Sequence, residues 1–340
     1  MLYAMKLIGM NFKMKILVTG GCGFIGSNFL NLAFKKNFDS IMNIDSMTYA
    51  SNAENVNSKE QHNYEFRNID ITNIELIEKA VKEFKPNVIV HFAAESHVDN
   101  SISNPQNFIK TNVIGTYNLI EVSRKYYEKN ELKDFHFIHI STDEVFGDLP
   151  ETGYFKEDTP YDPSSPYSAS KAASDHLVSA WIRTYKFPAT ILNCSNNFGP
   201  NQHVEKLIPT IITNSFKGKQ IPVYGNGLNI REWIFVEDYC NAVFHVIDQR
   251  EKSVNETFCV GSGNELTNID IVEKICRIIN ANYDLSYDCL KLISFVEDRK
   301  GHDFRYAIDS SKIKKTLNFT IDTDFEEALT KTINWYKDKL

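Results

Sequence analysis

A glycine-spaced turn between a short apolar run and an amphipathic segment constrains the fold of this chain more than any other feature. The run 15–19 (KILVT) is typical of a strand, and the segment 24–36 that follows is typical of a helix. Gly20, Gly23 and Gly26 lie in the turn and at the start of the helix. Glycines spaced in this way permit a tight turn, the close approach of a pyrophosphate and contact between helix and strand. The turn therefore predicts a dinucleotide-binding βαβ unit at the start of the chain.

Strand-like and helix-like segments alternate after this turn. Further apolar or β-branched runs lie at 41–45, 64–67, 87–93, 135–141, 189–193 and 256–260. Helical patterns occupy 73–84, 106–128, 166–186 and 236–249. Strands separated by helices of this length predict parallel βαβ units with right-handed crossovers. We therefore expect an α/β fold, in which a doubly wound (Rossmann) parallel sheet is joined to a smaller mixed α/β C-terminal substrate lobe.

The alternation weakens after residue 199, where prolines and glycines become more frequent. This change sets the domain boundaries that we expect. The dinucleotide-binding domain is predicted to comprise 14–198 and about 231–262, and the second domain about 199–230 and 263–340.

Composition excludes several classes of protein. Of the 340 residues, 42% are hydrophobic and 24% are charged, as in a globular chain that buries a core. The net charge of −7 argues against nucleic-acid binding, which requires a basic surface. The six cysteines are scattered without a CxxC pair, so we expect reduced thiols, no metal site and a cytoplasmic location. No apolar stretch is long enough to span a membrane, and residues 1–13 form an extension that lacks the pattern of a signal peptide.

The end of the second predicted strand indicates which dinucleotide binds. Asp45 lies 25 residues after Gly20, where a carboxylate can accept hydrogen bonds from the adenosine ribose and repel a 2′-phosphate. This position predicts NAD rather than NADP, although the same aspartate could cap the turn that follows it. Asp70 and Ile71 follow the third strand at the same edge of the sheet and could contact the adenine.

Tyr167 and Lys171 form a YxxxK pattern at the start of a predicted helix. The spacing of four places the phenol and the ammonium on one helix face. A cation beside the phenol favours phenolate and lowers the pKa of the tyrosine toward neutrality. Thr142 lies upstream at the end of a predicted strand, where a hydroxyl partner would be needed. The three residues together predict a catalytic base rather than a surface pair.

These features together resemble the extended short-chain dehydrogenase/reductase superfamily and, within it, the dTDP-glucose 4,6-dehydratases. The segments that carry the resemblance are 92–99 (FAAESHVD), 141–147 (STDEVFG), 167–175 (YSASKAASD), 193–200 (NCSNNFGP), 205–209 (EKLIP), 229–233 (NIREW) and 298–306 (DRKGHDFRY). The resemblance extends from about residue 14 into the last 30 residues. Lys300 departs from it by replacing a usual proline, and Phe146 and Phe198 stand where tyrosines are common.

The resemblance implies a dehydration that begins with oxidation of the sugar at C4. Tyr167 would take the proton from O4 while NAD accepts the hydride. Glu144 would then remove the C5 proton, protonated Asp143 would give its proton to the departing 6-hydroxyl, and the hydride would return to C6. Adjacent carboxylates in opposite roles require that burial and the neighbouring charge raise one pKa. The catalytic residues implied are Thr142, Asp143, Glu144, Tyr167 and Lys171.

The resemblance also implies two sets of contacts. For NAD we expect Gly20, Gly23, Phe24, Ile25, Gly26, Asp45, Thr48, Asp70, Ile71, Phe92, Ala93, Ala94, Thr111, Tyr167, Lys171 and Asn197. For a nucleotide-sugar substrate, dTDP-glucose above all, we expect Ser96, Thr142, Asn196, Lys206, Leu207, Pro222, Tyr224, Arg231, Asn268, Arg299 and His302. His91 and His97 are interpreted as structural.

Several alternatives stay open. The chain could be a 4,6-dehydratase of a UDP-, CDP- or GDP-linked hexose. A nucleotide-sugar 4-epimerase is disfavoured by Asp143 and Glu144, and a non-catalytic dinucleotide sensor would have no use for an acid and a base. The resemblance further implies a homodimer that uses the helices 106–128 and 166–186, and a place in deoxysugar biosynthesis such as that of rhamnose in surface glycans (O-antigen).

Overall fold

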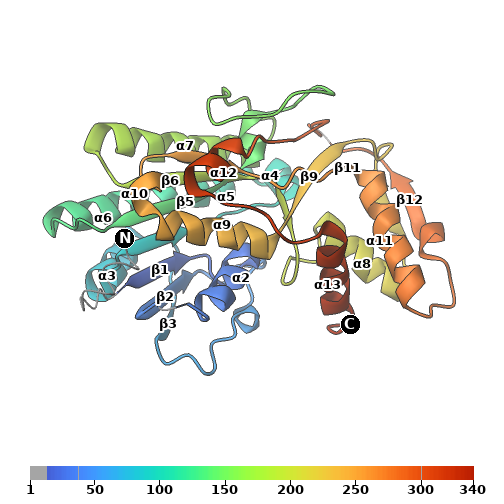
Figure 1. The fold of residues 1–340 in the computed structure, drawn as a ribbon, viewed down its shortest axis with the longest axis horizontal. Coiled ribbons are helices and arrows are strands. Elements are labelled where there is room, and N and C mark those ends of the chain that lie inside the picture. Colours follow the sequence, from blue (N-terminus) through green and yellow to red (C-terminus); the bar gives the residue numbers. More distant parts are fainter. Residues whose placement is uncertain (1–13, 37, 300) are drawn as a thin grey trace.

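A seven-stranded parallel sheet forms the larger part of the computed structural model, which describes residues 14–36, 38–299 and 301–340. Its strands lie in the order β10-β6-β5-β4-β1-β2-β3 (Figure 1). They are β1 (Lys15–Thr19), β2 (Ser40–Asp45), β3 (Tyr64–Asn68), β4 (Val88–His91), β5 (His136–Thr142), β6 (Ala189–Cys194) and β10 (Thr257–Val260). Every neighbouring pair is parallel, so the predicted doubly wound α/β fold is confirmed. The predicted extension 1–13 and the departure at Lys300 lie outside the described residues.

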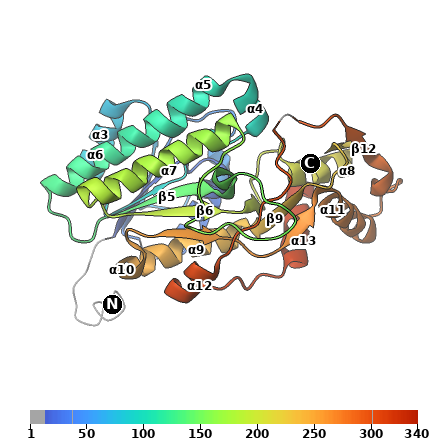
Figure 2. The ribbon, with the colours of Figure 1, turned by 90° about the horizontal axis from the view of Figure 1, so that it is seen from above.

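Helices cover both faces of this sheet, which explains why inner strands such as β1 and β4 are nearly continuous apolar runs. Helices α6 and α7 lie side by side on one face, and α9 lies on the other (Figure 2). Alternate residues of β1 show the two environments, because Ile16 and Val18 belong to one buried cluster and Leu17 to another. The helices around the sheet are α2 (Phe24–Ala33), α3 (Ile74–Phe84), α6 (Thr116–Lys129), α7 (Pro166–Tyr185), α9 (Val236–Asp248), α10 (Arg250–Ser253) and α12 (Ser311–Leu317).

The strand order reverses between β1 and β4, and this reversal fixes where a ligand can bind. From β1 the sheet continues to β2 on one side and to β4 on the other. In open parallel sheets the crevice at such a point, beyond the carboxyl ends of the strands, is the usual binding site. Thr19, Asp45 and Thr142 end their strands at this edge. The predicted site residues therefore share one end of the sheet.

The C-terminal lobe combines helices with two small sheets. Its helices are α8 (Leu207–Lys217), α11 (Asn268–Asn282) and α13 (Phe325–Lys337), and its two-stranded sheet pairs β8 (Ile221–Tyr224) with β12 (Ile293–Val296). In a three-stranded sheet, β9 (Ile230–Phe235) lies between β7 (Asn196–Phe198) and β11 (Glu265–Thr267). Strand β9 thus joins segments assigned to different domains, and the domain boundaries proposed from the sequence stay a prediction.

The segment predicted as one helix over 106–128 is interrupted. It consists of α5 (Pro105–Phe108), a π-helical stretch η2 (Ile109–Gly115) and α6, and α4 (Val98–Ser103) precedes it. Within η2, the Asn112 side chain accepts a hydrogen bond from the backbone N–H of Glu95 and donates one to its carbonyl. Short π-helical stretches inside helices are frequent at functional sites. Across the described residues, each helix is too short or too polar to cross a membrane.

Candidate active site

A cavity of about 640 Å³ lies at the carboxyl ends of the strands and is lined by both lobes. With one exception, the structure brings every residue predicted for the cofactor, the substrate or catalysis to the wall of this cavity. The exception is Asp143, which is 1% exposed and lies behind the wall. It begins the short 3-10 helix η3 (Asp143–Phe146), directly after Thr142 ends β5.

The glycine turn at one end of the cavity has the shape that a pyrophosphate needs. Gly20 has a φ of +70°, and a Cβ there would lie 2.6 Å from the backbone nitrogen of Ala93. A Cβ on Gly26 would lie 2.3 Å from the carbonyl oxygen of Gly20. Helix α2 begins after Gly23 without a side-chain cap, so its first N–H groups are free to bind phosphate oxygens. The turn thus fits a dinucleotide.

Asp45 at the end of β2 is nearly fully hydrogen-bonded within the chain. One carboxylate oxygen accepts from the backbone N–H of Cys22 at 2.9 Å. The other accepts from the backbone N–H of Met47 at 2.8 Å and from the Ser51 hydroxyl at 2.9 Å. An ionised carboxylate offers about four acceptor positions, so one remains for a ribose hydroxyl. Asp45 therefore combines the two functions considered from the sequence, because it shapes the turn and faces the cavity.

Helix α7 positions the YxxxK pair at the other end of the cavity. A capping box between Ser165 and Ser168 fixes the start of the helix, so that Tyr167 lies in its first turn. The Lys171 ammonium donates a hydrogen bond to the carbonyl oxygen of Ile140 at 2.8 Å. Tyr167 and Lys171 are 8% and 4% exposed. The pair is thus held in a nearly dry environment beside the end of β5.

This burial corrects one expectation from the sequence. Lysine proximity predicted a pKa of Tyr167 near neutrality, but burial raises the pKa of this phenol well above its ordinary value. The charge of Glu144 raises it further. The sequence argument considered the cation one helical turn away and omitted desolvation, which favours the neutral phenol.

The adjacent carboxylates differ in their electrostatic surroundings. Burial raises the pKa of Asp143 well above its ordinary range, and the neighbouring Glu144 and the buried Glu232 raise it further. Burial also raises the pKa of Glu144, but three cations oppose this shift. Those cations are Arg299, Lys206 and Arg231. Asp143 is therefore suited to hold a proton, and Glu144 is suited to take one.

Several predicted binding residues carry buried polar atoms that lack a hydrogen-bond partner among the described residues. These atoms are Oδ1 of Asn196, Asn197 and Asn268 and Nε of Arg299. Buried polar groups are nearly always paired, so unpaired ones on a cavity wall indicate a polar ligand. Arg231 is anchored differently, with its guanidinium 4.3 Å from the Tyr306 ring.

The sequence analysis did not identify two buried polar residues, Asn112 and Asp175, and it did not expect His97 to line the cavity. Asn112 donates to the Ser170 hydroxyl at 2.8 Å, and no spacing or motif in the sequence marks it. Asp175 was visible in the YSASKAASD segment but received no role. His97, interpreted as structural, caps α4 and also lines the cavity, whereas His91 is buried between the hydroxyls of Thr19 and Thr116.

Comparison with known proteins gives consistent relatives. The family model described as GDP-mannose 4,6 dehydratase matches residues 17–332. A dTDP-glucose 4,6-dehydratase of Escherichia coli is 48% identical, over 95% of this chain and 93% of its own length. The enzyme of the same name from Neisseria gonorrhoeae is 45% identical, over 96% of both chains.

Solved structures agree with these sequence relatives. A dTDP-glucose 4,6-dehydratase from Streptomyces venezuelae, with NAD bound, has a TM-score of 0.86 at 37% identity and covers 96% of this chain and 97% of that chain. A UDP-glucose 4-epimerase from Thermotoga maritima has a TM-score of 0.85 at 25% identity, with coverage of 96% and 99%. The fold is thus shared by both classes of enzyme, so the side chains at the site must distinguish them.

Proposed function

This chain belongs to the family of dTDP-glucose 4,6-dehydratases, and from that membership we propose that it converts dTDP-glucose to dTDP-4-keto-6-deoxy-glucose with NAD as cofactor. One observation carries the proposal. Glu144 and Tyr167 face one cavity, and Asp143 lies directly beside Glu144 with a pKa raised well above its ordinary range. Such a set supplies two bases and one acid. Oxidation at C4 requires Tyr167, and the elimination of water across C5 and C6 requires one further base and one acid, whereas epimerisation at C4 has no use for the carboxylates.

NAD is the cofactor that the residues of the cavity fit. The glycine turn, the free N–H groups at the start of α2 and the remaining acceptor position of Asp45 would hold its pyrophosphate and ribose. When bound, NAD would supply the hydride chemistry of the reaction, from C4 of the sugar to C6, and its oxidised ring would add a positive charge beside Tyr167 and Lys171. Tyr167 and Lys171 lie at the other end of the same cavity, where the sugar would react.

The side chains divide the proton transfers among themselves. Tyr167 takes the proton of the C4 hydroxyl as a phenolate. The positive charges of the Lys171 ammonium and of the oxidised cofactor would favour this anion and oppose the burial that raises the pKa of Tyr167. The ketone formed at C4 makes the C5 proton acidic, and Glu144 removes it. Asp143 gives its proton to the 6-hydroxyl, which leaves as water, and Glu144 returns a proton to C5 when the hydride reaches C6. The reaction is a hydro-lyase reaction, since it releases water and leaves the cofactor oxidised again.

Asp143 must reach the 6-hydroxyl although it lies behind the cavity wall. Its Oδ1 atom lies 3.2 Å from the Thr142 hydroxyl, and its Oδ2 atom has no partner among the residues described. Thr142 lines the cavity and its hydroxyl contacts the acid, so this residue offers a path from Asp143 toward a bound sugar. We propose that proton donation takes place along this short contact or after a small rotation of the Asp143 side chain.

A homodimer is part of the same proposal. Apolar side chains stay exposed along α4, η2, α6 and the end of α7, which lie together on one face of the sheet (Figure 2). They are Ile102, Ile109, Ile114, Tyr117 and Tyr185. A second copy that packs the same helices against these residues would bury this surface. Sedimentation velocity tests the proposal, and a monomer at micromolar concentration would refute it.

Mass spectrometry of the reaction tests the function directly. The purified protein is incubated separately with dTDP-, UDP-, CDP- and GDP-glucose, without added reductant. We expect the loss of one water from dTDP-glucose, with no net formation of NADH. Loss of water from another donor alone would reassign the nucleotide. Unchanged mass with an altered hexose configuration by NMR would indicate a 4-epimerase instead, and the absence of any reaction despite bound NAD would favour the sensor.

A further inference from the structure

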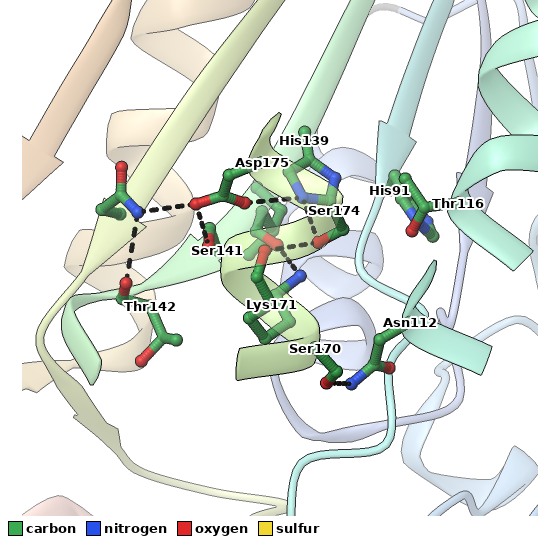
Figure 3. Close-up of polar contacts among 12 residues, drawn as sticks. His91, Asn112, Thr116, His139, Ser141, Thr142, Ser170, Lys171, Ser174 and Asp175 are labelled. Carbon is green, nitrogen blue, oxygen red and sulfur yellow. Dashed lines mark hydrogen bonds and ion pairs between the residues drawn. The ribbon is translucent and has the colours of Figure 1, made fainter. Parts of the chain in front are cut away.

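A buried carboxylate lies one helical turn beyond Lys171, on the side away from the cavity. Asp175 is 1% exposed and stands on α7, four residues after the lysine. Strand β5 directs His139 and Ser141 toward it, because residues two apart on a strand share a face (Figure 3). His139 Nε2 lies 3.0 Å from Oδ1, and the Ser141 hydroxyl donates to Oδ2 at 2.7 Å.

Two further donors complete the surroundings of this carboxylate. The Tyr161 hydroxyl donates to Oδ2 at 3.0 Å, and the Asn193 amide donates to the same oxygen at 3.1 Å. Asp175 thus accepts four hydrogen bonds, about as many as an ionised carboxylate can take. Burial raises the pKa of Asp175, but the hydrogen bonds from His139 and Ser141 and the positive charge of Lys171 outweigh this effect and hold the pKa below its ordinary value. Asp175 is therefore an anion in the interior of the protein.

None of these four donors balances the negative charge. Serine, tyrosine and asparagine are neutral donors, and burial lowers the pKa of His139 to about 4, so its ring is neutral at pH 7. Lys171 supplies the positive charge. The residue is 4% exposed, and burial lowers the pKa of its ammonium, while the charge of Asp175 opposes this effect. An anion and a cation thus share one face of α7 in a nearly dry environment.

Other titratable groups face this pair from every neighbouring element. They are His91 on β4, His139 on β5, Asp143 and Glu144 after β5, Cys194 on β6, Tyr161 before α7, Tyr167 on α7 and Tyr239 on α9. Of Asp143, Glu144 and Asp175, the three carboxylates in this group of described residues, Asp175 is the one whose charge raises the pKa of Lys171.

We propose that Asp175 is a positioning residue for the proposed dehydration, because its buried carboxylate keeps Lys171 charged and fixes the end of β5. The second effect follows from Asn193, whose amide bridges the carboxylate and the carbonyl oxygen of Thr142, at 3.2 Å from the latter. The hydroxyl bond from Ser141 holds the preceding residue of the same strand. Asp175 therefore acts on the reaction through Lys171 and Thr142, without contact with the substrate.

The test compares Asp175→Asn with Tyr161→Phe. Both variants remove a hydrogen bond within the network, but only the first removes the charge. In Asp175→Asn the ammonium loses its counter-charge, so the pKa of Lys171 falls. An opposite charge nearby shifts a pKa by about 1–3 units, so the alkaline limb of the kcat–pH profile should move to lower pH by about one unit or more. Tyr161→Phe should lower the thermal unfolding midpoint and leave that limb in place.

The outcomes separate this inference, which rests on the proposed function, from that function itself. A loss of kcat in Asp175→Asn that is equal at all pH values would show a merely structural role and overturn the inference. If Asp175→Asn does not fold, Asp175→Ser gives the same comparison, because the smaller residue leaves room for water. If wild-type protein turns over no donor, the proposed function fails. The inference is then tested by the NAD⁺ dissociation constant, whose alkaline rise should shift to lower pH in the variant.

Discussion

Burial of His136 in β5 leads us to a quantitative prediction about the stability of the protein in acid. The His136 side chain is fully buried, and its Nε2 atom lies 2.8 Å from the Thr190 hydroxyl. Burial lowers the pKa of this imidazole from 6.5 to about 3. Because the folded pKa is depressed, the unfolded chain binds a proton at pH 5 and the folded chain does not. Stability is therefore lost as the pH falls below 6.5, and the loss stops near pH 3.

The loss of stability that His136 causes at pH 5 depends on its pKa in the unfolded chain alone, since its pKa in the folded protein lies well below that pH. Each pH unit below an unfolded pKa of about 6.5 stabilises the unfolded chain by about 1.4 kcal/mol. His136 should therefore cost the protein about 2 kcal/mol between pH 7 and pH 5. In His136→Gln this part of the pH dependence is absent, so the fall in unfolding free energy should be smaller by about 2 kcal/mol.

Urea unfolding followed by circular dichroism at pH 7 and pH 5 measures this difference. The matched control is Thr190→Val, which removes the hydrogen-bond partner but keeps the titrating ring. It should be less stable than wild type at both pH values and should retain the full fall between them. Equal falls for wild type and His136→Gln would refute the reasoning, because the histidine would then not be held neutral.

Three further predictions concern the site. In Glu144→Gln the base for C5 is lost, so product formation should fall by about 10²–10⁴-fold, and mass spectrometry in D₂O should show no deuterium entering C5. In Asp143→Asn the acid is lost instead, so product formation should fall by a similar factor while deuterium still enters C5; loss of both signals would contradict the assignment. In Gly26→Ala the new Cβ would lie 2.3 Å from the Gly20 carbonyl oxygen. This variant should retain less NAD, measured by the ratio of absorbance at 260 and 280 nm, and should lose about 1–3 kcal/mol of stability from overpacking.

The sequence was sufficient for the parts of the fold that depend on local pattern. Strands such as β1 and β4 are mostly apolar on both faces because helices cover the sheet on both sides, and that burial leaves a signal within a few residues. The glycine turn is equally local, because its shape depends on contacts between its own glycines and the strand beside it. Spacing along α7 likewise placed Tyr167 and Lys171 together.

What could not be predicted depends on contacts between distant segments. The small sheet that joins β7, β9 and β11 combines pieces from three parts of the chain, and none of these strands has a pattern of its own. Asn112 lies in the π-helical stretch η2 and binds the backbone of Glu95, and it reaches Ser170 far along the sequence. The raised pKa of Tyr167 has the same origin, since burial and Glu144 act on it through the folded structure.

The polar residues inside β5 and β6 connect the acid sensitivity with the chemistry. A lysine ammonium can stay charged in a nearly dry site only if an anion lies near it, and that anion must itself be solvated by the protein. Neutral side chains of the sheet do this for Asp175, and His139 is one of them. The His139 ring must stay neutral if Lys171 is to be the group that balances the charge of Asp175. Burial ensures this, because it lowers the pKa of His139 to about 4. Because the pKa of His139 is low only in the folded protein, the unfolded chain takes up a proton at a higher pH than the folded chain does. A sheet that keeps Lys171 charged at neutral pH is therefore necessarily a sheet that loses stability in acid.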